Sequence, residues 1–222
     1  YYDGLALGSV SKGDETKVES ARAVDNGAFA WFTEGASTYD AVGRETSSTD
    51  ALGRTTTTAY TPSGAGLPTS TTTTTPDPDG TGALTPHVGV ATVDPRWGQP
   101  TKTVAADGTV TEATYDALGR TSQVWAPGRS KSTQTASTTF AYAVASRAPT
   151  AVTTKTLLPD ESYLSSVQLY DGLLRAKQTQ TQTVDQKVVD GVVSSTEGRL
   201  VTDAVFDDRG LAVKAQGPTL AS

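Results

Sequence analysis

The sequence contains no cysteine, no methionine and only one histidine, His87. Without cysteine there is no disulfide framework and no thiolate metal site, which leaves the redox compartment open. A zinc site needs about four nitrogen or sulfur ligands, so a single histidine argues against one. His87 borders a proline-rich stretch, where a solvated residue at the end of a strand is the simpler interpretation. We therefore predict no catalytic residue, no cofactor and no metal, and we do not expect an enzyme.

Long apolar runs and an excess of positive charge are also missing. No run of about 18 apolar residues exists, so no membrane span is predicted, and the start at Tyr1 lacks the pattern of a signal peptide. The net charge is −6 and the 18 basic residues are scattered, which argues against a nucleic-acid-binding surface. Because methionine is absent, we expect the chain to begin inside a longer gene product.

The residues that are abundant favour extended backbone. Hydrophobic residues make up 36% and aromatics 7% of the chain, which predicts a thin core spread along a sheet. Threonine and valine are abundant, together with alanine and glycine, and the branched Cβ of threonine and valine favours strands. Isoleucine is absent and asparagine occurs once, as codons rich in G and C would give, which hints at an actinobacterial source.

A short phrase recurs along the chain, in full at 39–44 and 115–120 and in part at 49–54, 93–98, 170–175 and 206–210. Each copy combines a strand end, an Asp that can hydrogen-bond its own turn and, usually, a Gly where φ must be positive. A turn repeated so often predicts antiparallel β-hairpins. We assign structural turn roles to Tyr39, Asp40, Gly43, Arg44, Asp50, Gly53, Arg54, Tyr115, Asp116, Gly119, Arg120, Tyr170, Asp171, Arg175, Asp207 and Gly210.

The clearest hairpins lie between residues 101 and 125. Residues 101–106 and 109–115 alternate around Asp107-Gly108, a strong two-residue turn signal, and a second turn leads into 120–125. Three antiparallel strands are therefore expected here. Further strands are predicted over 150–158 and up to Tyr170, with turns at 159–162, 171–174, 190–191 and 207–210.

The organisation predicted is a leading segment over 1–36 followed by a repeat array over 37–222. A short helix is plausible only over 14–22, with Asp14 as its N-cap. Residues 61–86 are rich in Thr, Pro and Gly and predict an exposed linker or long loop.

Three acidic groups suggest chemistry at first sight. Pro76-Asp77-Pro78-Asp79-Gly80 resembles the start of a calcium loop, but the further ligands and terminal Glu are missing, so we interpret it as a turn. Asp207 and Asp208 occupy a repeat turn and need no acid/base role. We expect the side chains of Asp116 and Arg120 to lie close together across the end of a hairpin. Because such pairs recur along the chain, we interpret their role as structural.

The Tyr-Asp-x-x-Gly-Arg phrase resembles the YD repeat of the Rhs family, which includes bacterial polymorphic toxins, Tc-toxin shell components and teneurins. The resemblance covers about residues 37–215 and implies an all-β fold, in which antiparallel hairpin repeats form part of a long curled sheet. It implies a structural shell section of a secreted or cell-surface bacterial protein, with neighbouring Rhs-repeat segments and an enclosed C-terminal, often toxic, polypeptide as partners. The family's self-cleaving segment is not recognisable here.

Two other classes of function stay open from the residues alone. One is a surface adhesion or carbohydrate-binding β-array, in which Trp31, Trp97 and Trp125 would stack on sugars. The other is an enzyme, for which the sequence offers few nucleophile arrangements. The sequence does not fix strand register or which face of the sheet would line an interior.

Overall fold

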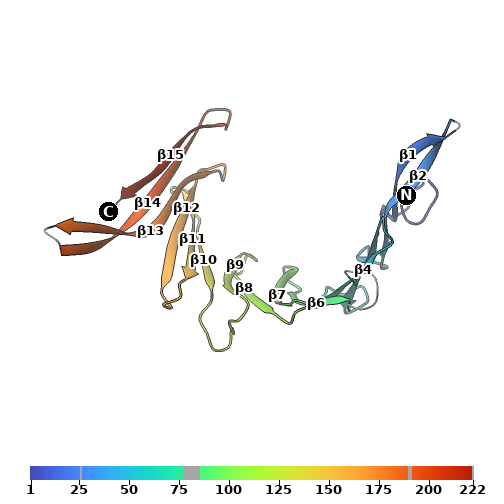
Figure 1. Ribbon diagram of the computed structural model, residues 1–222, viewed down its shortest axis with the longest axis horizontal. Helices are drawn as coiled ribbons and strands as arrows, with labels where there is room; N and C mark the ends of the chain where they lie inside the picture. The colour runs from blue at the N-terminus through green and yellow to red at the C-terminus, as the bar shows by residue number, and fades with distance from the viewer. Residues whose placement is uncertain (26, 78–85, 190–191, 222) are drawn as a thin grey trace. The chain divides into compact units, whose positions relative to one another are not determined.

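The computed structural model describes residues 1–25, 27–77, 86–189 and 192–221, and within them the chain consists of strands and turns without a helix (Figure 1). Its contacts divide the chain into two compact units, Tyr1–Glu112 and Ala113–Ser222. In each unit, hydrogen-bonded neighbours follow one another in chain order and every pair is antiparallel. The prediction of an all-β fold with hairpin connectivity is confirmed.

The first unit contains strands separated by short turns and by a longer loop over residues 62–69. Its strands are β1 Lys17–Asp25, β2 Ala28–Tyr39, β3 Glu45–Asp50, β4 Thr55–Thr61, β5 Ser70–Thr75, β6 His87–Asp94 and β7 Gln99–Val104, and β8 Val110–Tyr115 lies across the boundary between the units. The hairpin of β7 and β8 has the predicted Asp107-Gly108 turn, in which Gly108 has φ 80°.

The second unit is built in the same way, with longer strands toward its end. Its strands are β9 Thr121–Trp125, β10 Thr138–Ala143, β11 Thr150–Leu157, β12 Tyr163–Tyr170, β13 Ala176–Val189, β14 Val192–Phe206 and β15 Ala212–Ala221. The predicted strand that ends at Tyr170 is thus β12. The predicted turn at Asp190-Gly191 lies outside the described residues.

The hydrophobic core is very thin. Among the described residues, the buried hydrophobic side chains are Trp125, 6% exposed, and Ala136, 3% exposed. Many strands carry mostly threonine, serine and glutamine on the sheet faces, as β5 does, so the hydrogen bonds between strands carry much of the order. No described helix is long and apolar enough to cross a membrane.

The helix considered over 14–22 is wrong. Lys17–Asp25 form β1, which pairs with β2 along Lys17↔Ala36 to Asp25↔Ala28. Asp14 therefore caps no helix, and its N–H donates to the carboxylate of Asp3, 3.0 Å away. Pairing with a long neighbouring strand outweighs the weak local helix signal.

The loop expected over 61–86 is corrected in part. Ser70–Thr75 form β5, which pairs with β4 on one side and with β6 on the other. The five consecutive threonines are good strand formers and override the flanking prolines. The boundary placed after residue 36 stays a prediction, and β2 runs across it.

Candidate functional site

Four turns share one geometry, and we call them the Asp-Arg turns: Asp40–Arg44, Asp50–Arg54, Asp116–Arg120 and Asp171–Arg175. In the first, the Asp40 N–H donates to the Arg44 carbonyl at 2.9 Å. The Asp40 Oδ1 accepts the N–H groups of Val42 and Arg44, each at 3.0 Å. The Arg44 Nε donates to Oδ2 at 2.6 Å. One carboxylate therefore closes the turn and also orients its arginine.

The other three turns repeat these bonds closely. The arginine Nε lies 2.8 Å from the aspartate Oδ2 at Arg54 and 2.7 Å at both Arg120 and Arg175. The residue before each arginine donates its N–H to the aspartate carbonyl. The structure thus brings together the Asp and Arg residues that the sequence singled out, pair by pair.

The residue before the arginine has positive φ in every Asp-Arg turn. Gly43, Gly53 and Gly119 have φ of 81°, 78° and 75°. The fourth turn places Leu174 there, with φ 59°, although Gly172 lies two residues earlier. A residue with a Cβ is strained in this region, so Leu174 marks a weak point in its turn.

Two other aspartate turns depart from this geometry. In the turns at Asp94 and Asp207 the arginine lies two residues after the aspartate, and the Arg96 Nη2 approaches the Asp94 Oδ2 at 2.6 Å. The Asp207 turn otherwise keeps the backbone pattern of the Asp-Arg turns: Gly210 has φ 83°, and the Asp207 Oδ1 accepts the N–H groups of Arg209 and Leu211. The Arg96 and Arg209 side chains are 77% and 81% exposed, so they contribute little to packing.

Hydrogen bonds hold the turn carboxylates ionised. At Asp50 the Arg54 side chain and then its N–H lower the pKa of the carboxyl. At Asp171 the Arg175 N–H is the largest cause of the lowered pKa. At Asp40 and Asp116 desolvation is the largest effect and raises the pKa, but the hydrogen bonds and charges of Arg44 and Arg120, with the N–H groups of Val42 and Leu118, together outweigh it, and the pKa is lowered.

Three of the four arginines also stack on an aromatic ring from a later strand. The guanidinium carbon lies 4.5 Å from the Tyr60 ring at Arg44, 4.3 Å from Tyr142 at Arg120 and 4.5 Å from Phe206 at Arg175. The two tyrosine hydroxyls donate to the carbonyl that follows each arginine, of Glu45 and of Thr121. Each such turn therefore clamps the end of another strand.

The fourth arginine lacks this partner. Among the described residues no ring lies over Arg54, whose side chain is 55% exposed against 17% for Arg44. The copy of the repeat phrase at Asp50–Arg54 therefore forms the turn, but its arginine does not hold an aromatic residue of another strand.

The tyrosines of the repeat phrase lie elsewhere. The Tyr39 hydroxyl donates to the Glu15 carbonyl at 2.9 Å, and the Tyr170 hydroxyl donates to Gln168. Burial raises the pKa of Tyr115 on β8. Sequence reasoning missed the stacking rings of Tyr60, Tyr142 and Phe206, because their distance along the chain from the arginine differs in each case.

A second feature that the sequence did not indicate is the loop over 126–137. It packs against Trp125, whose Nε1–H donates to the Gln134 carbonyl at 2.9 Å. The Tyr163 hydroxyl donates to the Ala136 carbonyl, and Arg129 pairs with Glu161 at 3.1 Å. This contact covers Trp125 and Ala136, the two buried hydrophobic residues among those described.

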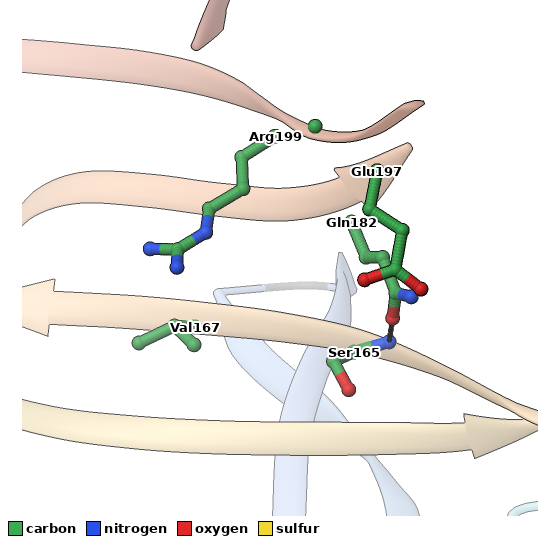
Figure 2. A pocket seen from close by; sticks show the side chains of 6 residues that line it. Ser165, Val167, Gln182, Glu197 and Arg199 are labelled. Atoms are coloured by element: carbon green, nitrogen blue, oxygen red, sulfur yellow. Dashed lines mark hydrogen bonds between the residues drawn. The ribbon is translucent and has the colours of Figure 1, made fainter. Parts of the chain in front are cut away.

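An open hollow of about 460 Å³ lies on β12, β13 and β14 of the second unit (Figure 2). It is lined by Ser165, Val167, Gln182, Glu197, Gly198 and Arg199. Figure 2 shows Gln182 accepting a hydrogen bond from the Ser165 N–H, at 3.1 Å. Beside it, Arg199 donates to Gln180, Gln180 donates to Gln178, and Gln178 donates to Asp203. These polar groups satisfy one another, and none forms a nucleophile and base pair.

No cluster of three or more His, Cys, Asp or Glu residues that could hold a metal ion occurs in the described part of the chain. His87 lies at the start of β6 and is exposed. The candidate calcium loop over 76–80 lies partly outside the described residues.

Comparison with known proteins identifies the repeat. Residues 39–81 match the family model of the RHS repeat, so the chain carries an Rhs repeat and the resemblance found in the sequence is confirmed. No curated protein matches the chain.

Two solved structures show the same fold. A Tc holotoxin pore of Photorhabdus luminescens with a TccC3 variant matches with a TM-score of 0.53 and 16% identity, over 86% of this chain and 10% of that chain. The crystal structure of TcdB2-TccC3-TEV matches with a TM-score of 0.61 and 13% identity, over 92% and 14%. This chain therefore spans a small part of the length of either.

Proposed function

We propose that this chain is a structural section of an Rhs-type β-shell that encloses a C-terminal, often toxic, polypeptide in a secreted or cell-surface bacterial protein. The observation that carries the proposal is the repeated Asp-Arg turn, which joins consecutive antiparallel strands with the same hydrogen bonds each time. A catalytic site is normally built once, whereas a wall is built by repetition.

The composition of the sheets supports the same role. On β3 to β8 the side chains are largely threonine, serine, alanine and valine, many of them half-buried, and the described residues have little hydrophobic core. Such a sheet offers few large apolar anchors, which dominate tight interfaces. It suits a wall that holds a guest polypeptide without binding it tightly. In this proposal the chain has no catalytic function, and its partners are neighbouring repeat segments and the enclosed polypeptide.

Protease protection of the full-length protein tests the proposal. We expect proteinase K to leave the C-terminal region intact while the repeats are folded, and to digest it once denaturant opens the wall. The same region expressed without the repeats is the control for its intrinsic susceptibility. Digestion at the same rate with and without the folded repeats would contradict enclosure.

One observation favours a second candidate, a carbohydrate-binding or adhesion module. A hollow of about 260 Å³ in the first unit is lined by Tyr1, Tyr2, Leu7, Glu15, Lys17, Val18, Glu19 and Trp31, and Trp31 is 60% exposed. Aromatic faces beside carboxylates suit a sugar ring with its hydroxyls. Under this candidate, oligosaccharides change the tryptophan fluorescence and Trp31→Ala abolishes the change, whereas Trp97→Ala keeps it.

A further inference from the structure

Every second connection of the second unit lies at the same rim of its sheet, because all its paired strands are antiparallel. One rim contains four connections, over residues 116–120, 144–149, 171–175 and 207–211. The opposite rim contains the loop over 126–137 and the turn over 158–162, and its third connection lies outside the described residues. Consecutive connections at one rim are two strands apart, which is about 10 Å.

The two rims differ in the apolar surface that they expose. The connections of the first rim carry five large aliphatic side chains that are 58–74% exposed: Leu118, Val144, Leu173, Leu174 and Leu211. The described connections of the opposite rim carry one exposed large hydrophobic side chain, Leu158, at 36%. Single exposed apolar residues are ordinary on a protein surface, but a row of them on one side is typical of a contact surface. We call the first rim the apolar rim.

The turns themselves do not require these side chains. In each Asp-Arg turn the second residue after the aspartate donates its N–H to the aspartate Oδ1 at 2.9–3.0 Å, and any residue except proline could do so. An aliphatic residue nevertheless stands there in all four turns, with exposures of 50–76%: Val42, Leu52, Leu118 and Leu173. Because the hydrogen bonds of the turn use only the N–H of this residue, the recurrence of its side chain indicates a contact outside the turn.

The charges on the apolar rim balance. The Asp116 and Asp171 carboxylates each lie 2.7 Å from the arginine of their turn. The four connections together contain four acidic and four basic residues: Asp116, Asp171, Asp207, Asp208, Arg120, Arg147, Arg175 and Arg209. Two rims of this composition would therefore not repel each other.

We propose that the apolar rim of the second unit packs against the turns of another repeat segment of the same protein, with Leu118 and Leu173 as contact residues. This rests on the proposed function, in which further repeat segments complete the wall. Hydrogen bonds between strands close a sheet from side to side, but they do not join it to anything beyond the strand ends. A wall that encloses a guest must therefore also be closed at its rims.

The spacing of the apolar rim favours a repeat segment as the partner. A partner that meets all four connections must present apolar groups about every 10 Å along a line, as the rim does. A second row of Asp-Arg turns has this spacing, carries an aliphatic residue at the same position of each turn, and has its aspartate and arginine paired. An enclosed polypeptide has no such fixed spacing.

Photo-cross-linking of the full-length protein tests this contact, with p-benzoylphenylalanine in place of either Leu118 or Leu173. Both side chains are exposed, and the N–H that each turn needs is kept. Thr154 and Lys155 are the controls, because adjacent residues of β11 lie on the two faces of the sheet and not at its rim. Circular dichroism checks that each variant folds, and peptide mass spectrometry identifies the cross-linked residues.

We expect both rim positions to cross-link to turn residues of another repeat segment in the same chain, and both controls to give no product with a repeat segment. Cross-links from the rim to the C-terminal region or to a second copy, or no cross-links from it, would overturn the inference. Equal cross-linking of the controls to repeat segments would do the same. Proteinase K reports on enclosure separately, so a protected C-terminal region without rim cross-links would leave the proposed function in place and this inference wrong.

Discussion

At the scale of single residues, one aspartate organises each turn. Its carboxylate accepts two backbone N–H groups and an arginine Nε, as Asp116 does at 2.9, 3.0 and 2.7 Å. The sequence predicted both the turn and the proximity of Asp116 and Arg120, since an Asp before a Gly has a local mechanism. It did not predict the ring of Tyr142, because that contact depends on strand register and not on local sequence.

Substitutions at the left-handed position test the turn geometry. Gly119→Val should lower the free energy of unfolding by about 1–2 kcal/mol, because φ is 75° and a Cβ resists that conformation. Leu174→Gly should raise it by up to about 1 kcal/mol by relieving the same strain, since the Leu174 side chain is 68% exposed. Urea unfolding measures both, and a loss of stability in both variants would contradict the strain at Leu174.

Matched arginine variants test the clamp. Arg44→Lys should destabilise the chain by about 1–2 kcal/mol, since lysine cannot at once stack on Tyr60, keep the planar contact with Asp40 and donate to the Gly64 and Gly66 carbonyls. Arg54→Lys is the control, because the same phrase there has an exposed pair worth at most about 1 kcal/mol. Equal decreases in the thermal unfolding temperature of the two variants would show that the Tyr60 ring contributes nothing to stability.

The turn carboxylates predict how stability depends on pH. The pKa values of Asp40, Asp50, Asp116 and Asp171 are lowered in the folded chain. The unfolded chain, with aspartate pKa near 3.9, therefore binds more protons at acid pH. These carboxylates make their full contribution to the free energy of unfolding above about pH 5. This contribution is lost as the pH falls through the pKa values of the folded chain.

Urea midpoints should thus stay constant from about pH 7 to 5 and fall below about pH 4. Asp3 should be protonated last, because hydrogen bonds led by the Ser11 N–H lower its pKa to about 2. A variant with Asn at the four turn aspartates should show a shallower fall. Greater stability at pH 3 than at pH 7 would contradict the predicted direction of the pH dependence.

At the scale of strands and loops, local pattern predicted most strands where turn signals bracket them. The strands over 101–125 appear as β7, β8 and β9, because Asp107-Gly108 and Asp116–Gly119 fix both turns. The Ser70–Thr75 strand was missed because prolines nearby indicated a loop, although β4 and β6 supply partners on both sides. The loop over 126–137 had no sequence signal, since its order comes from contacts with Trp125, Tyr163 and Glu161.

Removing Trp125 should release this loop. Trp125→Ala should cost about 3 kcal/mol or more and expose Arg129 and Lys131 to trypsin, because the ring is 6% exposed and its Nε1–H holds Gln134. Trp97→Ala is the control, as Trp97 is 40% exposed. Mass spectrometry of early tryptic fragments identifies the cut sites. Unchanged protection of the loop in Trp125→Ala would contradict its docking on this ring.

At the scale of the whole molecule, repetition in the sequence predicted the fold class, and residues 39–81 match the RHS repeat. Composition and alternation predicted sheets with thin cores. The two faces of the sheet could not be assigned from the sequence, because a shift of one residue in register exchanges them, and the register follows only from pairings such as Lys155 with Ser165 and Gln182 with Arg199.

Electron cryo-microscopy of the full-length protein is the most direct test of whether these repeats form the wall of a closed shell. We expect a hollow particle whose wall contains residues 1–222 as consecutive antiparallel strands, with density for a polypeptide inside. An extended array with both sheet faces open to solvent, or a particle without an internal space, would contradict it.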